Sequence, residues 1–227
     1  MIPLHDDNPT ELAPVLTVGL IGACVLVFLW QSSLGEEGGL RAIYSFGLIP
    51  AVLFDHVVLT EELARVPATA TLVTSMFMHG GWGHLLGNML YLWIFGNNIE
   101  DRLGHGRFIL FYLLCGLAAA FAQALPDTAS QVPMVGASGA ISGVLGAYLL
   151  LFPHARILVL IPIGFYPYTL RLPALAVLGL WFLLQLISSM ATTPGEGGVA
   201  FGAHIGGFVA GLALLPLFLL TVRRRRR

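Results

Sequence analysis

Charged residues are scarce in this chain of 227 residues, of which they make up 10 %, against about 25 % in an ordinary soluble domain. Lysine is absent, so every one of the 11 basic residues is an arginine. Apolar residue types account for 57 %, and the mean hydropathy is +0.85. This composition excludes a soluble globular protein. It predicts an integral membrane protein with room for about six helices of about 20 residues.

Other common features are missing as well. The first 11 residues contain no arginine, so we expect no removable signal peptide. The only two cysteines, Cys24 and Cys115, fall inside apolar runs, so we expect no disulfide. Residues 223–227 are all arginine and directly follow an apolar run without interleaved aromatics. They are therefore expected to bind anionic lipid headgroups rather than nucleic acid.

Six apolar segments predict membrane spans and an all-α membrane protein. A short cytoplasmic segment at 1–14 precedes the membrane domain at 15–222, and the arginine tail at 223–227 follows it. The connection between the first two spans contains apolar pieces broken by Gly and Pro, which suggests short segments in the membrane interface. Segment 157–172 carries two prolines and is expected to be an interfacial or re-entrant connection. The spans are predicted at about 16–30, 84–99, 108–125, 136–152, 173–190 and 199–222.

The arginines predict the orientation of these spans. An even number of spans places both termini on one side of the membrane. If that side is the cytoplasm, only Arg41 and Arg65 fall in outer connections, as the positive-inside rule requires. We therefore expect a multi-pass protein of a bacterial inner (plasma) membrane with both termini in the cytoplasm.

Four polar side chains stand out inside the apolar spans, where such groups are costly and therefore candidates for function. They are His84 and Asn88 on the second span, Ser138 on the fourth and His204 on the sixth. In the predicted topology each lies toward the outer end of its helix, so together they can form one site. The alternatives are that Ser138 is packing filler within the glycine-rich stretch 136–143, and that each histidine only bonds a neighbouring helix.

The chemistry of these residue types favours acyl transfer. A serine nucleophile needs a base within hydrogen-bond reach, and His204 is the candidate. The backbone N–H of Ser138 and the side chains of His84 and Asn88, four residues apart on one helical face, can stabilise an oxyanion. No Asp or Glu lies at this depth, so a hydrolase would use a dyad. The spacings of Gly139 with Gly143 and of Gly207 with Gly211 predict close helix packing.

Other functions are less consistent with the sequence. His79, His84 and Asn88 could be metal ligands, but their spacing is not that of a zinc-binding helix and no acid or thiol completes the set, so neither a metal nor another cofactor is expected. A transporter or channel would show an acid pair, a repeat or paired broken helices. A catalytically silent relative that only binds membrane helices is the remaining alternative. Gln123 and Gln185 are expected to be interhelical hydrogen-bonders.

Three motifs resemble the rhomboid family of intramembrane serine proteases. These are His79-x4-His84-x3-Asn88, Gly136-Ala137-Ser138-Gly139, and Ala203-His204 followed by Gly207. The resemblance implies a six-transmembrane-helix rhomboid bundle with a long membrane-embedded first loop, around a water-filled cavity that opens to the outer side. It implies Ser138 as nucleophile, His204 as base, His84, Asn88 and the Ser138 N–H as the oxyanion hole, and His79 as a supporting residue.

The same resemblance implies the substrates and the route by which they enter. Substrates would be transmembrane segments of other proteins with small residues near the cleavage site. The fifth span and loop 191–198 would form the gate and the cap. Two features depart from the family pattern: Ser142 stands where some members have a tyrosine that packs the base, and a Trp-Arg pair of the first loop is absent. Because Ser142 replaces that tyrosine, the sequence leaves open which residue orients His204.

Overall fold

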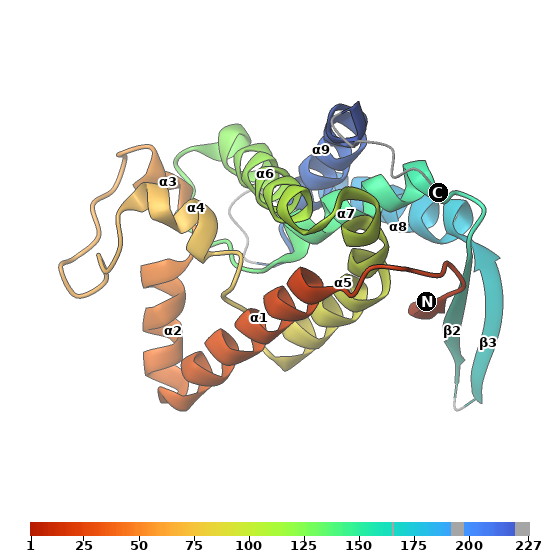
Figure 1. The fold of residues 1–227 in the computed structure, drawn as a ribbon. Coiled ribbons are helices and arrows are strands. Elements are labelled where there is room, and N and C mark those ends of the chain that lie inside the picture. The colour runs from red at the N-terminus through yellow and green to blue at the C-terminus, as the bar shows by residue number, and fades with distance from the viewer. Residues whose placement is uncertain (165, 192–197, 221–227) are drawn as a thin grey trace.

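A computed structural model describes residues 1–164, 166–191 and 198–220, and their arrangement is mostly helical (Figure 1). A long helix lies on each predicted span. These helices are α1 (Val15–Ser33), α5 (Trp82–Leu103), α6 (His105–Ala124), α7 (Ser138–Leu151), α8 (Ala174–Ala191) and α9 (Phe201–Leu220).

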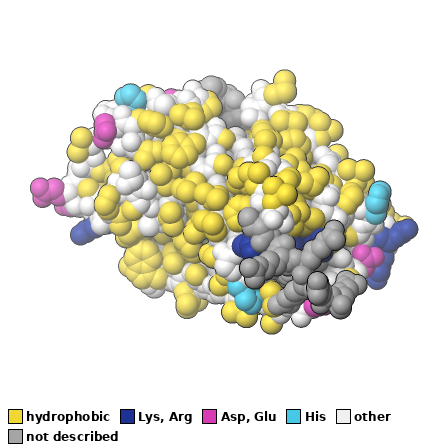
Figure 2. All heavy atoms as spheres, turned by 45° about the horizontal axis from the view of Figure 1, so that its top comes forward, with side chains coloured by type: hydrophobic (Ala, Val, Ile, Leu, Met, Phe, Trp, Pro, Cys, Tyr) yellow, Lys and Arg dark blue, Asp and Glu magenta, His cyan; other side chains and the backbone are white. Residues whose placement is uncertain are grey.

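The helices differ in how well they suit a bilayer. By length and hydropathy, four in the described part of the chain can cross a membrane, namely α1, α6 with the turn that follows it, α8 and α9. Helix α7 is apolar but has 14 residues. Figure 2 shows a face dominated by hydrophobic side chains, with sparse charged groups mainly near its two ends. That distribution fits a protein surrounded by lipid.

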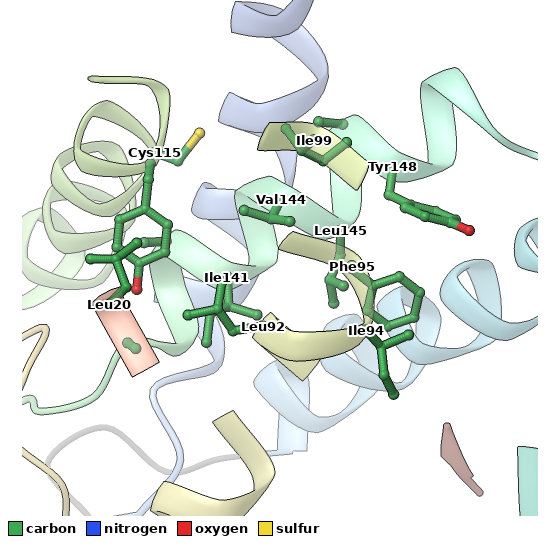
Figure 3. Close-up of a cluster of buried hydrophobic side chains, with 14 of the residues drawn as sticks. Leu20, Leu92, Ile94, Phe95, Ile99, Cys115, Ile141, Val144, Leu145 and Tyr148 are labelled. Atoms are coloured by element: carbon green, nitrogen blue, oxygen red, sulfur yellow. The ribbon is translucent and has the colours of Figure 1, made fainter. Parts of the chain in front are cut away.

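Helix α7 is the centre of the bundle. It is buried without interruption from Gly139 to Tyr148, as expected for a helix that is apolar on all sides. It packs against α5, α6, α8 and α9. Figure 3 shows Ile141, Val144 and Leu145 of this helix in contact with a cluster to which α1, α5 and α6 also contribute. Residues on α7 are therefore held in position from several directions.

Helices α7 and α9 meet backbone to backbone. A Cβ atom on Gly207 would lie 2.0 Å from the carbonyl oxygen of Gly139, and one on Gly211 would lie 2.0 Å from that of Gly143. Both distances are far inside van der Waals contact, so only glycine permits this approach. The close packing predicted from the glycine spacing is confirmed, and it brings the start of α9 next to the start of α7.

The connection between α1 and α5 contains one substantial helix and several short turns. These are α2 (Gly35–Phe46), α3 (Pro50–Leu53), the 3-10 turn η1 (Ala68–Ala70) and α4 (Thr71–Thr74). Two backbone hydrogen bonds between Leu48 and Met134 tie this connection to the segment that precedes α7. Figure 1 shows α3 and α4 at the end of the molecule opposite the strands.

A three-stranded antiparallel sheet stands where we expected an interfacial or re-entrant connection. Its strands are β1 (Ile2–Asp6), β2 (Arg156–Ile163) and β3 (Tyr166–Pro173), in the order β1-β2-β3. Ile157 and Val159 of β2 are fully buried, and Leu170 and Leu172 of β3 pack against the helical core on the same face. Both faces of β2 are apolar, so the two-residue period is hidden in the sequence. The protein is therefore mostly helical rather than all-α.

The N-terminal segment is fastened to the helices by a buried carboxylate. Asp6 is 4 % exposed. Its Oδ2 accepts hydrogen bonds from the Tyr148 hydroxyl at 2.6 Å and from Nδ2 of Asn98 at 3.0 Å. Asn8 adds a bond of 2.8 Å from its Nδ2 to Oδ1 of Asn98. These contacts join β1 to α5 and α7.

A second buried carboxylate holds the start of α1. Glu100, near the end of α5, is fully buried and accepts hydrogen bonds from the backbone N–H groups of Leu16 and Thr17 and from the Thr17 hydroxyl, at 2.7–2.9 Å. His105 also bonds Glu100. The orphan N–H groups at the start of α1 are thus satisfied from a neighbouring helix.

Candidate active site

One cavity of about 460 Å³ receives the starts of three helices. His84 and Asn88 lie in the first two turns of α5, Ser138 is the first residue of α7, and His204 is the fourth residue of α9. All four line the cavity. The prediction that the second, fourth and sixth spans present these side chains to one place is therefore matched by the structure.

Ser138 and His204 are in direct contact. The distance between Ser138 Oγ and His204 Nε2 is 2.8 Å, within the range of a strong hydrogen bond. This contact follows from the glycine packing, because Gly139 and Gly207 are the residues next to Ser138 and one turn after His204. The serine is therefore not packing filler alone, since its hydroxyl is bonded to an imidazole inside a cavity.

The second nitrogen of His204 is held by α8. Nδ1 of His204 lies 2.7 Å from Oε1 of Gln185. One turn earlier on the same helix, the Trp181 ring packs over the imidazole with centroids 5.9 Å apart and an interplanar angle of 34°. Gln185 was expected to be an interhelical hydrogen-bonder, and its bond to His204 on α9 confirms this, whereas Trp181 was not singled out from the sequence. The usable signal was a glutamine inside an otherwise apolar span.

Ser142 does not contact the imidazole. It is buried, and its hydroxyl donates to the Ser138 carbonyl oxygen within α7 at 2.6 Å. This is the bond that a serine in a helix commonly makes to the carbonyl four residues earlier. The orientation of His204, which the sequence left open, is thus set by Gln185 of α8 together with Ser138, and not by a hydrogen bond from Ser142.

His84 and Asn88 lie beside the residue that leads into Ser138. Gly136 has φ = 122°, a conformation that favours glycine. A Cβ atom there would lie 2.7 Å from Nε2 of His84 and 3.5 Å from Nδ2 of Asn88. Gly136 thus lets both side chains approach the loop before α7. Nδ2 of Asn88 is buried and has no hydrogen-bond partner in the described part of the chain.

His79 is further from Ser138 and is held by the first span. It is fully buried, and its ring lies edge-on to His84 with centroids 5.2 Å apart. The side-chain amide of Gln31 donates to the His79 carbonyl at 2.8 Å and accepts from its N–H at 3.3 Å. Sequence reasoning did not single out Gln31. The arrangement is compatible with a supporting role for His79 behind His84.

Two remaining predictions concern the metal site and the cap. No group of three or more His, Cys, Asp or Glu side chains that could hold a metal ion occurs among residues 1–164, 166–191 and 198–220. The predicted cap lies largely at 192–197, and the arginine tail lies at 223–227, both outside the described residues. The described residues that follow the cap, Gly198 and Val199, line the cavity.

Comparison with known proteins agrees with the motifs around this cavity. The family model of the Rhomboid domain matches residues 66–221. This range includes His84, Asn88, Ser138 and His204. The chain belongs to the rhomboid family. Rhomboid relatives come from distant organisms. Rhomboid protein 1, mitochondrial, of Saccharomyces cerevisiae is 32 % identical over 156 residues, which cover 65 % of this chain and 41 % of the yeast protein.

Two bacterial rhomboid relatives carry the word protease in their names. Rhomboid protease GluP of Bacillus subtilis is 34 % identical over 143 residues, covering 63 % of this chain and 25 % of that protein. Rhomboid protease GlpG of an Enterobacter species is 27 % identical over 217 residues, covering 95 % of this chain and 67 % of that protein. The matched region thus spans less than half of the yeast and Bacillus proteins.

Proposed function

We propose that this rhomboid protein is an intramembrane serine endopeptidase that cleaves transmembrane segments of other membrane proteins with a Ser-His dyad. The observation that carries the proposal is the 2.8 Å contact between Ser138 Oγ and His204 Nε2 within a cavity. Membership of a family with relatives named proteases supports the same reaction.

In the proposed reaction, Ser138 Oγ attacks the carbonyl carbon of the scissile peptide bond while its proton passes to Nε2 of His204. The tetrahedral intermediate collapses by breaking the C–N bond, and the leaving amine takes the proton from His204. A water molecule in the cavity then gives its proton to His204 and attacks the acyl-enzyme ester. This second half of the reaction releases the new carboxyl group and returns the proton to Ser138.

We propose that the oxyanion is stabilised from two helices. Ser138 opens α7, so its backbone N–H is one of those without a helical acceptor. The buried Nδ2 group of Asn88 has no partner among the described residues, as expected of a donor reserved for the intermediate. The Gly80 N–H points at Nδ1 of His84 at 3.4 Å, which leaves Nε2 of His84 to carry the proton toward Gly136.

We further propose a six-span topology, with both termini in the cytoplasm of a bacterial cell and the cavity open to the outer side of the inner membrane. His84, Asn88, Ser138 and His204 all lie in the first two turns of their helices α5, α7 and α9, so these helices would enter the membrane from one side. Helices α5 and α7 would complete the four apolar spans, and the connection containing α2 would be the membrane-embedded first loop.

We propose a transmembrane helix with small residues near its cleavage site as the substrate, as the resemblance to the rhomboid family implies. Helix α8 exposes large apolar residues such as Leu183, Leu184 and Ile187. It is therefore a suitable gate through which a substrate helix and lipid acyl chains come into contact with the bundle.

The test is cleavage of a single-span model substrate by the purified protein in detergent. Ser138→Ala and His204→Ala are expected to abolish cleavage, and a fluorophosphonate probe is expected to label the unaltered protein but not Ser138→Ala. The matched controls Ser32→Ala and His154→Ala, both at exposed positions that do not line the cavity, are expected to cleave normally. Cleavage that survives Ser138→Ala would overturn the dyad. A protein that binds such helices without cleaving any would be a non-catalytic relative.

A further inference from the structure

Helix α8 supplies the only side-chain acceptor that the described residues place on Nδ1 of His204. Gln185 Oε1 lies 2.7 Å from this nitrogen, while the opposite ring nitrogen faces Ser138 at 2.8 Å. The imidazole is therefore bonded at both nitrogens by residues from two different helices. A base held at both ends can adopt only one ring orientation.

The surroundings of Gln185 decide which atom of its amide faces the histidine. The amide nitrogen Nε2 lies 3.4 Å from the backbone carbonyl oxygen of Trp181. A carbonyl oxygen only accepts hydrogen bonds, so the NH₂ group must be the one directed at it. The amide oxygen is then left for His204, and an oxygen can only accept.

The acceptor on Gln185 in turn decides which nitrogen of His204 carries the proton. In a neutral imidazole one nitrogen donates and the other accepts. Because Gln185 Oε1 accepts, Nδ1 must be the protonated nitrogen, and Nε2 has its lone pair directed at the Ser138 hydroxyl. That tautomer is the one able to remove the serine proton.

We propose that Gln185 is the positioning residue of the dyad: from α8 it selects the Nδ1–H tautomer of His204 and fixes the ring against Ser138. The inference rests on the proposed function. Gln185 takes the place that an acid holds in a Ser-His-Asp triad. An amide oxygen performs this role without placing a formal charge inside the membrane.

Few titratable side chains face His204 from the elements that surround it. The cavity contains His84 and Tyr91, both on α5. Helix α8 has no titratable residue, and neither has α9 apart from His204, while Tyr148 on α7 bonds Asp6. Where α6 packs against the start of α9, it presents Ala118, Ala122 and Gln123. A charge introduced at position 185 would therefore act on His204 at hydrogen-bond distance, in addition to any charge that His84 carries.

The first experiment removes the acceptor and keeps the length of the side chain. Gln185→Met replaces the amide with a thioether, which is a weak acceptor. We expect kcat for a single-span substrate to fall about tenfold, the equivalent of one hydrogen bond, with KM unchanged. Labelling of Ser138 by the fluorophosphonate probe is expected to slow by a similar factor. The matched control Leu110→Met, at an exposed position of α6 that does not line the cavity, is expected to keep the unaltered rates.

The second experiment retains the acceptor and adds a charge. In Gln185→Glu, a carboxylate facing Nδ1–H stabilises the imidazolium, which cannot act as a base. We expect kcat at its optimum to stay within about threefold of the unaltered protein. The acid limb of the pH–rate profile is expected to move to higher pH by about one unit or more. A purely structural role for Gln185 would not move that limb.

The outcomes separate this inference from the proposed function. If the unaltered protein does not cleave, or Ser138→Ala still does, the proposed function fails. If cleavage depends on Ser138 but Gln185→Met keeps kcat within about twofold, the positioning role alone is overturned. Should Gln185→Met not fold, the glutamate variant decides: an unmoved acid limb together with a kcat reduced tenfold or more overturns the role, and the predicted shift supports it.

Discussion

At the scale of single residues, one of the two buried side-chain nitrogens without a hydrogen-bond partner among the described residues belongs to Asn88, which the proposed chemistry needs. Asn88 is 8 % exposed, and its Nδ2 has no partner among the described residues. A buried donor in this state costs the folded protein about 1–3 kcal/mol. Such a cost is expected where a donor is kept for a transient negative charge.

The unpartnered Nδ2 of Asn88 predicts that Asn88→Ala lowers activity without lowering stability. The substitution removes an oxyanion donor, so kcat is expected to fall by about a hundredfold or more. It breaks no hydrogen bond made by Nδ2, so the thermal unfolding temperature is expected to stay close to that of the unaltered protein. Kinetics on a single-span substrate and differential scanning fluorimetry measure the two quantities.

The contrasting variant is Asn8→Ala at the other end of the molecule. Nδ2 of Asn8 donates to Asn98 at 2.8 Å, so its loss is expected to lower the unfolding temperature without changing kcat. If Asn88→Ala cleaves as fast as the unaltered protein, Asn88 is not part of the oxyanion hole.

At the scale of elements, α1 is held by a carboxylate that belongs to α5. Glu100 accepts hydrogen bonds from two backbone N–H groups and one hydroxyl at the start of α1. A negative charge at a helix N-terminus is also favoured by the helix dipole. Glu100 therefore connects two helices that are separated in the sequence by the whole first connection.

Glu100→Ala is expected to destabilise the protein strongly. The N–H group of half-buried Leu16 and the N–H and hydroxyl groups of buried Thr17 would lose their acceptor, at a combined cost of about 3 kcal/mol. The measurement is unfolding by SDS in mixed micelles. The control is Glu37→Ala, which removes an exposed pair with Arg41 on α2 and is expected to change the unfolding free energy by less than about 0.5 kcal/mol. Equal effects of the two variants would contradict the capping role.

The contact between α7 and α9 predicts a different outcome, in which stability and activity fall together. In Gly207→Ala the new methyl group would lie 2.0 Å from the Gly139 carbonyl oxygen, so the two helices must separate. A displacement of about 1 Å at reacting groups can cost about a hundredfold in rate. We expect a lower unfolding temperature and a loss of kcat on this scale, measured on the same substrate.

Gly179→Ala is the matched control for that experiment. No atom lies within 4 Å of the position that a Cβ would take on Gly179 of α8. Alanine also has a better helix propensity than glycine, by about 1 kcal/mol. We therefore expect unchanged or slightly higher stability and full activity. A Gly207→Ala variant that behaves like Gly179→Ala would show that the helices do not need this close approach.

At the scale of the whole molecule, the sheet links the start of the chain to the connection between α7 and α8. Strand β1 pairs with β2, and Asp6 at its end reaches Tyr148 and Asn98. Burial raises the pKa of Asp6 above its usual 3.8, against hydrogen bonds from Tyr148 and Asn98 and the nearby His5, which lower it. The folded protein therefore holds the Asp6 proton more tightly than the unfolded chain does.

This shift gives a sign to the pH dependence of stability. With a raised folded pKa, the stabilising contribution of Asp6 is fully present below 3.8. It is lost as the pH rises through the folded pKa. Asp6→Asn cannot ionise, so its unfolding temperature is expected to change less with pH from about pH 4 upward. Scanning fluorimetry across pH measures this difference. Parallel curves for the two proteins would contradict the role of Asp6.

Much of the fold and of the candidate site could be predicted from local patterns. Each span predicted from hydropathy coincides with a helix to within a few residues, because the cost of polar groups in lipid acts on each segment independently. Ser138, His84, Asn88 and His204 were identifiable because polar groups are rare in such segments. The glycine spacing predicted the contact that joins α7 to α9.

Other features depended on contacts between distant positions. Strand β2 was missed because both of its faces carry apolar side chains, so its sequence shows no two-residue period. The partners of Glu100 on α1 could not be predicted, since a carboxylate near a helix end can accept hydrogen bonds from donors on several elements. Gln185 was predicted to be an interhelical hydrogen-bonder, but the sequence does not tell that its partner is His204.

By itself, then, the sequence determined a membrane protein of the rhomboid family and the residues available for its chemistry, since composition, apolar length and motif spacing are local properties of the chain. Only the tertiary structure decided how those residues are oriented. Gln185 lies 19 positions from His204, and Asp6 lies 142 positions from Tyr148. Hydrogen bonds of about 3 Å between such positions depend on how whole helices pack, and no local pattern encodes that packing.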